Sequence, residues 1–206
     1  MQILQLINLN AYAMDMHGVD NDVLSKIVLS SNQKPDAGKF MEDNHHTYFE
    51  DTVLPDTPEI HDLCEKISSA VSGVLKQEYV IDSIWGLILN HSESVIMHSH
   101  KSNTHLHPSE FYSIAYYPSV PEGSAELIFS LTHCNVIEQS ISITPKEGML
   151  VIFNSYIPHM TSRHLAEEPR IVISANLSPV SPNNQIVPDW TPYKLRERKG
   201  DIDVSL

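Results

Sequence analysis

The sequence predicts a mainly β protein with N-terminal helices, folded as a double-stranded β-helix, or jelly roll. Beyond Tyr79, short apolar or alternating runs follow one another, separated by Asn, Ser, Gly and Pro. Such spacing, with no helical pattern between the runs, is typical of antiparallel sandwiches and barrels. With an opening strand in residues 1–14, about eight strands are expected, as in a jelly roll. The later runs are residues 80–89, 94–100, 111–117, 125–129, 139–144, 148–153 and 170–177.

Two helices are expected between the opening strand and the later runs. Apolar residues at i, i+1, i+4 and i+5 predict a short amphipathic helix over residues 20–30. Thr57 can cap a second helix, and Pro58 suits its first position, where no backbone hydrogen bond is lost. An apolar stripe then continues to Lys76, so this helix should cover one side of a sheet. The polar segment 31–54 is expected to be loop.

Residues 1–206 are expected to form one domain, with N-terminal helical segments at about 19–78 and a charged C-terminal tail at about 188–206. The runs at 148–153 and 170–177 are apolar at nearly every position, so both should be buried on both faces.

The composition narrows the class of protein. Hydrophobic residues make up 41% and charged residues 19%, as in globular proteins. A formal net charge of -13 argues against a nucleic-acid partner, because such binding neutralises phosphates with Lys and Arg. Two cysteines without CxxC spacing indicate a cytoplasmic location. We expect no membrane segment, because no apolar run approaches the roughly 18 residues that a membrane helix needs.

A histidine-rich stretch from Val95 to Pro118 stands out. It holds two His-x-His pairs, His98 with His100 and His105 with His107. On a β-strand, residues i and i+2 point to the same face, so either pair could bind one metal ion together with a third ligand from another strand.

Three sequence elements then occur in order. HLHPSEFYSIAYY begins at His105, GMLVIFNSYIPH ends at His159, and Arg170 follows eleven residues later, with Asn176 beyond it. Together these elements resemble the 2-oxoglutarate/Fe(II)-dependent dioxygenases, specifically the small bacterial and phage branch. The resemblance covers about Trp85 to Leu177.

The resemblance implies a dioxygenase that uses Fe(II), 2-oxoglutarate and O₂, hydroxylates its substrate and releases succinate and CO₂. It implies His159 as the far metal ligand and Arg170 as the anchor of the 2-oxoglutarate carboxylate. Beside Arg170, the expected co-substrate contacts are Ser174, Asn90 and Tyr112.

The near pair of metal ligands is open between two choices. His105 and His107 fit the family segment without a gap and are favoured, whereas His98 and His100 fit the family's usual distance from Trp85. Neither pair supplies the carboxylate of the common two-histidine, one-carboxylate triad, although an all-histidine site is chemically reasonable. The one literal His-x-Glu in the chain is His91 with Glu93.

Further alternatives concern the remaining residues and the function. His164 is the alternative to His159, and Arg163 the alternative to Arg170. HLHPSE also resembles a shortened cupin motif, which makes a cupin-type metalloenzyme the second reading. A non-catalytic metal-binding jelly-roll module is the third, because one fold hosts many functions.

Overall fold

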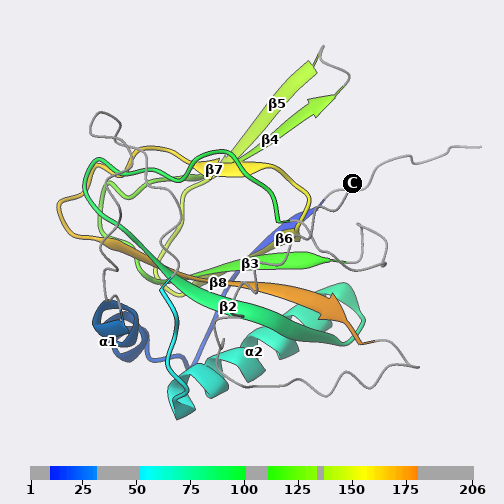
Figure 1. The fold of residues 1–206 in the computed structure, drawn as a ribbon. Coiled ribbons are helices and arrows are strands. Elements are labelled where there is room, and N and C mark those ends of the chain that lie inside the picture. The colour runs from blue at the N-terminus through cyan, green and yellow to red at the C-terminus, as the bar shows by residue number, and fades with distance from the viewer. Residues whose placement is uncertain (1–9, 32–51, 101–110, 134–136, 181–206) are drawn as a thin grey trace, which may run out of the picture.

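The computed structural model describes residues 10–31, 52–100, 111–133 and 137–180. Two antiparallel sheets face each other, and the two helices lie against the outer face of the larger sheet (Figure 1). In these ranges the elements are β1 (Ala11–Asp15), α1 (Asn21–Ser31), α2 (Pro58–Leu75), β2 (Tyr79–Leu89), β3 (Tyr112–Ser119), β4 (Leu127–His133), β5 (Ile137–Ile143), β6 (Met149–Asn154), β7 (His159–Thr161) and β8 (Arg170–Pro179).

The larger sheet has the strand order β1-β6-β3-β8-β2, and the smaller sheet has the order β5-β4-β7. Every pairing is antiparallel. The hairpin of β4 and β5 extends beyond the sandwich (Figure 1). The predicted jelly roll and the mainly β class are therefore confirmed.

The two helices follow their sequence signals. The Thr57 hydroxyl accepts a hydrogen bond from the backbone N–H of Ile60 at 3.4 Å, and Pro58 is the first helical residue. Helix α2 ends at Leu75, where Lys76 adopts a left-handed conformation with φ 58°. These caps satisfy terminal backbone groups that the helix leaves without partners.

The outer face of the larger sheet packs on the helices and forms the main core. The buried residues in this layer come mainly from β2, β3, β6, β8 and both helices, and they include Leu24, Val28, Leu63, Ile67, Ile114, Leu150, Ile171 and Ile173. Gly86 on β2 is needed for the close approach of α1, since an added Cβ would lie 2.8 Å from Cγ1 of Val28.

The inner face of the larger sheet packs on the smaller sheet. Its buried side chains include Ala115, Tyr117, Val151, Phe153 and Val172, which meet Leu127 and Phe129 of β4. Strands β6 and β8 contribute to both layers, which confirms that these two strands are buried on both faces. The functional cavity opens on this inner layer.

Two stretches differ from the expected strand pattern. The run 94–100 does not form a continuous strand; it pairs with β7 at single positions, one of which is His98 opposite His159. Strand β7 itself was not predicted. Residues 1–9, most of the expected loop at 31–54, and the tail at 188–206 lie outside the described residues.

Candidate metal and co-substrate site

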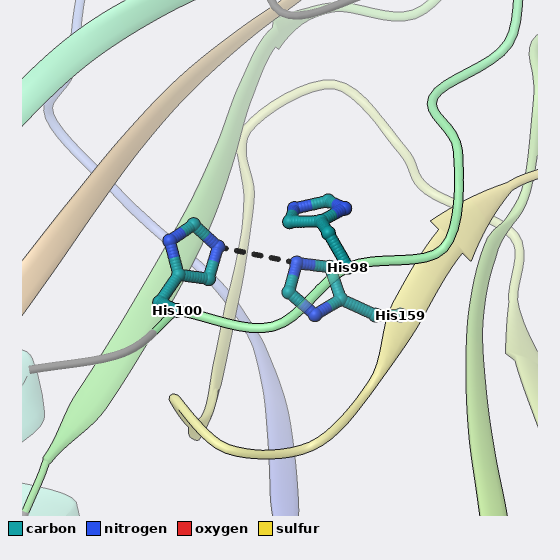
Figure 2. Close-up of side chains that lie close together, drawn as sticks. All are labelled: His98, His100 and His159. Atoms are coloured by element: carbon teal, nitrogen blue, oxygen red, sulfur yellow. Dashed lines mark hydrogen bonds between the residues drawn. The ribbon is translucent and has the colours of Figure 1, made fainter.

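Three imidazoles from two separate chain segments meet at the inner face of the sandwich. One ligand nitrogen from each of His98, His100 and His159 lies within 4.8 Å of the others (Figure 2). His98 and His159 are cross-strand partners, since each donates its backbone N–H to the other's carbonyl, at 3.0 and 2.8 Å. Directly opposed residues point to the same face, so the pairing itself brings the two rings together.

His100 completes the cluster from two residues further along. Its backbone N–H donates to the carbonyl of Ser155 at 2.8 Å, and Trp85 stands beside its ring at 5.6 Å between centroids. The Nε2 atoms of His100 and His159 are 3.3 Å apart. Two imidazole nitrogens that share a metal at about 2.1 Å each, at angles of roughly 90–110°, would lie about 3.0–3.4 Å apart. The observed separation therefore fits two ligands of one ion.

Backbone carbonyls fix how two of these rings are oriented. Nδ1 of His98 lies 2.8 Å from the carbonyl of Ile96, and Nδ1 of His159 lies 2.9 Å from the carbonyl of Ile157. A carbonyl can only accept, so Nδ1 carries the proton in both rings. In both rings Nε2 then carries the lone pair and is the atom that a metal would bind, and partners of this kind commonly orient metal-binding histidines.

The environment keeps the cluster neutral. Burial, reinforced by the neighbouring His98, lowers the pKa of His100 to about 4 and that of His159 to about 3. Burial also lowers the pKa of His98. Because a metal binds the neutral imidazole, a low pKa favours metal over protons near neutral pH.

A cavity joins the histidine cluster to Arg170. Its lining includes Trp85, Leu87, Tyr117, Val172 and Ser174, together with all three histidines. Arg170 is 2% exposed, and its Nη1 donates to the carbonyl of Ala125 at 2.6 Å. The guanidinium carbon stands 5.6 Å from the centre of the Tyr117 ring.

The charge of Arg170 is not balanced by the described part of the chain. No carboxylate among the described residues forms an ion pair with it, and its Nε has no hydrogen-bond partner there. Burial lowers its pKa, although the guanidinium stays charged at neutral pH. A buried, uncompensated cation costs several kcal/mol, so the arrangement favours an anionic ligand.

The other expected site residues lie in different places. Ser174 faces the cavity beside Trp85, its partner across β2 and β8. Tyr112 packs its ring against Tyr79 on the helix-covered side of the sheet. Asn90 follows β2, where its side chain and backbone N–H both donate to the Glu93 carboxylate. Of the described residues, neither Tyr112 nor Asn90 lines the cavity.

The favoured near pair, His105 and His107, lies outside the described residues. Among the described residues, the alternative pair, His98 and His100, lies close to His159. His91, of the literal His-x-Glu, is exposed at the turn after β2. Arg163 is exposed, and buried His164 stands apart from the metal cluster.

Two cavity residues were not expected from the sequence. Tyr117 lies beside Arg170, and Trp85 lies beside His100. The alternation of β3 could have indicated Tyr117, since Ser113 and Tyr117 share one face and Tyr116 occupies the other.

Comparison with known proteins points in one direction. The family model described as "Putative 2OG-Fe(II) oxygenase" matches residues 83–176, a little under half of the chain. No curated protein sequence matches the chain.

Several solved structures share the fold. The chain superposes on the non-heme alpha ketoglutarate dependent carbocyclase SnoK from nogalamycin biosynthesis with a TM-score of 0.63 and 9% identity, covering 82% of this chain and 79% of that one. HygX from Streptomyces hygroscopicus, with nickel and 2-oxoglutarate bound, superposes with a TM-score of 0.59 and 12% identity, covering 84% of this chain and 83% of that one. The viral collagen prolyl hydroxylase vCPH from Paramecium Bursaria Chlorella virus-1 superposes with a TM-score of 0.54 and 13% identity, covering 83% of this chain and 96% of that one. The chain spans only 56% of the length of the epimerase SnoN.

At these identities the structural likeness concerns the fold alone. Residues 83–176 are therefore similar to the 2OG-Fe(II) oxygenase family, and the rest of the chain lies outside the matched range. In the described ranges, no helix has the length and apolar character that crossing a membrane requires.

Proposed function

We propose that His98, His100 and His159 hold the Fe(II), that Arg170 binds the distal carboxylate of 2-oxoglutarate, and that the enzyme hydroxylates its substrate. The observation that carries this proposal is the cavity itself. A buried arginine without an acidic partner among the described residues shares it with three neutral imidazoles.

The protein's part in the reaction is to bind and to orient. The three imidazoles would hold the ion, and the adjoining cavity would receive the co-substrate and O₂. The planar guanidinium of Arg170 can pair a carboxylate through two parallel hydrogen bonds. The Ser174 hydroxyl lines the same cavity and can add a third.

The bound iron supplies oxidising chemistry that amino acids lack. With the metal and co-substrate bound, the site would support oxidation of a substrate C–H bond to a hydroxyl group, coupled to conversion of 2-oxoglutarate and O₂ into succinate and CO₂, with one atom of O₂ going to succinate and the other to the hydroxyl group. Apolar neighbours of the cavity such as Leu87, Phe153 and Val172 exclude water from this step.

The proposal places His100 where the common triad has a carboxylate. Imidazole suits iron, so the substitution is compatible with the class. It removes one negative charge from the site, which makes the anionic co-substrate more important for charge balance. In this proposal His98 and His100, and not His105 and His107, are the near pair of metal ligands.

Metal and co-substrate binding can be tested separately by calorimetry. His159→Ala and His98→Ala should weaken Zn(II) binding at least about 100-fold, because each removes one of three ligands. His91→Ala, at the exposed turn, is the matched control and should bind Zn(II) like the wild type. His105→Ala and His107→Ala should also retain the metal; loss of Zn(II) in these two would overturn the choice of near pair.

Arg170→Met should weaken 2-oxoglutarate binding about 100-fold while leaving Zn(II) affinity unchanged, because charge-assisted hydrogen bonds contribute about 1.5–3 kcal/mol each. Arg163→Met removes an exposed arginine of the same segment and serves as the control. The rate of succinate formation from 2-oxoglutarate with Fe(II), measured in the same variants, should fall wherever the affinity for the metal or for 2-oxoglutarate falls. Equal co-substrate binding in Arg170→Met and the wild type would refute the anchor.

A further inference from the structure

His164 is fully buried, with 0% of its surface exposed, yet it belongs to neither the metal cluster nor the described lining of the cavity. The sequence offered it as an alternative metal ligand. In the structure both of its ring nitrogens are already engaged with the protein. Its role therefore depends on the two backbone groups that these hydrogen bonds hold in place.

The two bonds select one neutral form of the ring. The backbone N–H of Ala125 donates to Nδ1 at 3.3 Å, so Nδ1 carries no proton. Nε2 carries the proton and donates it to the carbonyl of Glu168 at 2.8 Å. The backbone of His164 is held as well, since it donates to the carbonyl of Glu93 and accepts from Ser92, both at 2.8 Å. The ring thus connects two backbone segments through hydrogen bonds and is held in one orientation.

Both of these segments lead to Arg170. Ala125 is the residue whose carbonyl accepts the hydrogen bond from Nη1 of Arg170, at 2.6 Å. Glu168 lies two residues before Arg170, at the entrance to β8. One side chain therefore holds the start of the strand that carries the guanidinium and also the residue that the guanidinium contacts.

We propose that His164 is a positioning residue for the co-substrate anchor: it sets the place of Arg170 through Ala125 and Glu168. This inference rests on the proposed function, in which Arg170 binds the distal carboxylate of 2-oxoglutarate. It gives a buried histidine that touches neither metal nor co-substrate a specific effect on co-substrate affinity.

Two substitutions separate the two bonds. His164→Gln can place an amide near Nε2 and still donate to Glu168, but it leaves the Ala125 N–H without its acceptor. His164→Asn can still accept from Ala125 but loses Glu168. The matched control is Ser162→Ala, because the Ser162 hydroxyl accepts from the neighbouring backbone N–H of Glu126 at 2.9 Å and does not contact Arg170.

The experiment measures binding of two ligands to the Zn(II)-loaded full chain by calorimetry. 2-Oxoglutarate carries the distal carboxylate, whereas 2-oxobutyrate has the same 2-oxo acid group without it. His164→Gln should bind 2-oxoglutarate about tenfold more weakly, the effect of one lost hydrogen bond. Its affinities for Zn(II) and 2-oxobutyrate should stay within about twofold of the wild type, as should all affinities of Ser162→Ala. His164→Asn should fall between the wild type and His164→Gln, because it retains the bond to Ala125.

The outcomes are distinct. Wild-type 2-oxoglutarate affinity in His164→Gln would overturn the inference and leave the proposed function intact. An equal loss for both ligands would also overturn it, because a merely structural role would weaken binding without regard to the distal carboxylate. Failure of the wild type to bind 2-oxoglutarate would overturn the proposed function and this inference with it.

A measurement on the wild type covers the case in which neither variant folds. With ¹⁵N-labelled histidine and bound Zn(II), 2-oxoglutarate should shift the Nδ1 resonance of His164, because the anchor, Ala125 and the ring are joined by hydrogen bonds. 2-Oxobutyrate should leave this resonance in place. An unchanged resonance at saturating 2-oxoglutarate would overturn the inference.

Discussion

Acid should destabilise the metal-free protein through its histidine cluster. In the folded chain the pKa of His100 is about 4 and that of His159 about 3, because both are buried, against the ordinary value of 6.5. As the pH falls through 6.5, the unfolded imidazoles bind protons and the folded ones do not. The unfolded state then holds more protons, so stability falls with the pH. At pH 5, about 1.5 below the ordinary pKa, each imidazole lowers stability by about 2 kcal/mol relative to pH 8.

The assay is urea unfolding at pH 8 and pH 5 in the presence of a chelator. Between the two pH values, the free energy of unfolding of the wild type should fall by about 2 kcal/mol more than that of His100→Gln. The same comparison holds for His159→Gln. All other titrating groups are common to both proteins, so their effect cancels in the difference.

Val172→Ala is the control for this experiment. Val172 is a buried, uncharged neighbour in the same layer, so its replacement should lower stability equally at both pH values. Parallel pH profiles for the wild type and both histidine variants would refute the reasoning. They would mean that burial does not hold these imidazoles neutral in the folded protein.

Other substitutions test the fold and the anchor. Gly86→Ala should lower the free energy of unfolding by roughly 1–3 kcal/mol, because its Cβ would lie 2.8 Å from Cγ1 of Val28; an unchanged midpoint in urea would contradict this close approach. Thr57→Ala should lower the free energy of unfolding by about 1 kcal/mol, and Thr57→Ser should lower it much less, since serine retains the capping hydroxyl. Tyr117→Leu should weaken 2-oxoglutarate binding about three- to tenfold, whereas Tyr117→Phe retains the ring beside Arg170 and should bind almost normally. Equal calorimetric affinities in these two variants would exclude a role for the ring face.

Local sequence patterns predict most of the fold because local geometry determines most of it. Alternation and apolar runs indicated β2, β3, β6 and β8, and the Thr57-Pro58 signal indicated α2. Strand β7 was missed because three residues, His159–Thr161, show no readable period after Pro158. The run 94–100 was expected as a strand, but its partner β7 is too short to form a continuous ladder with it.

The side on which a side chain lies is harder to predict in strands that are buried on both faces. Tyr112 and Ser113 could each face the cavity as far as the sequence shows; in the structure Tyr112 packs against Tyr79 under the helices. Arg170 begins a run that is apolar at nearly every position, so alternation could not place its guanidinium. The prediction that Arg170 is the carboxylate anchor came from family spacing and not from periodicity.

The choice of near pair shows a different limit. Both His-x-His pairs have the same i, i+2 spacing, so their local geometry is identical. A pair of ligands must also lie near His159, and that depends on tertiary contacts and not on local spacing. The backbone bonds between His98 and His159 provide this long-range information. No periodicity within the segment contains it.

The metal cluster and Arg170 have complementary requirements that a single ligand can satisfy. Three imidazoles contribute no negative charge, so a divalent ion held by them would keep both of its positive charges, and Arg170 would add a third in the same cavity. No described residue that lines the cavity is a carboxylate. Like charges repel strongly in such a low-dielectric space. A ligand with one carboxylate for the metal and another for the guanidinium removes this repulsion at both ends. The same neutral triad that departs from the common ligand set thus makes a dicarboxylate such as 2-oxoglutarate the best electrostatic match for the cavity.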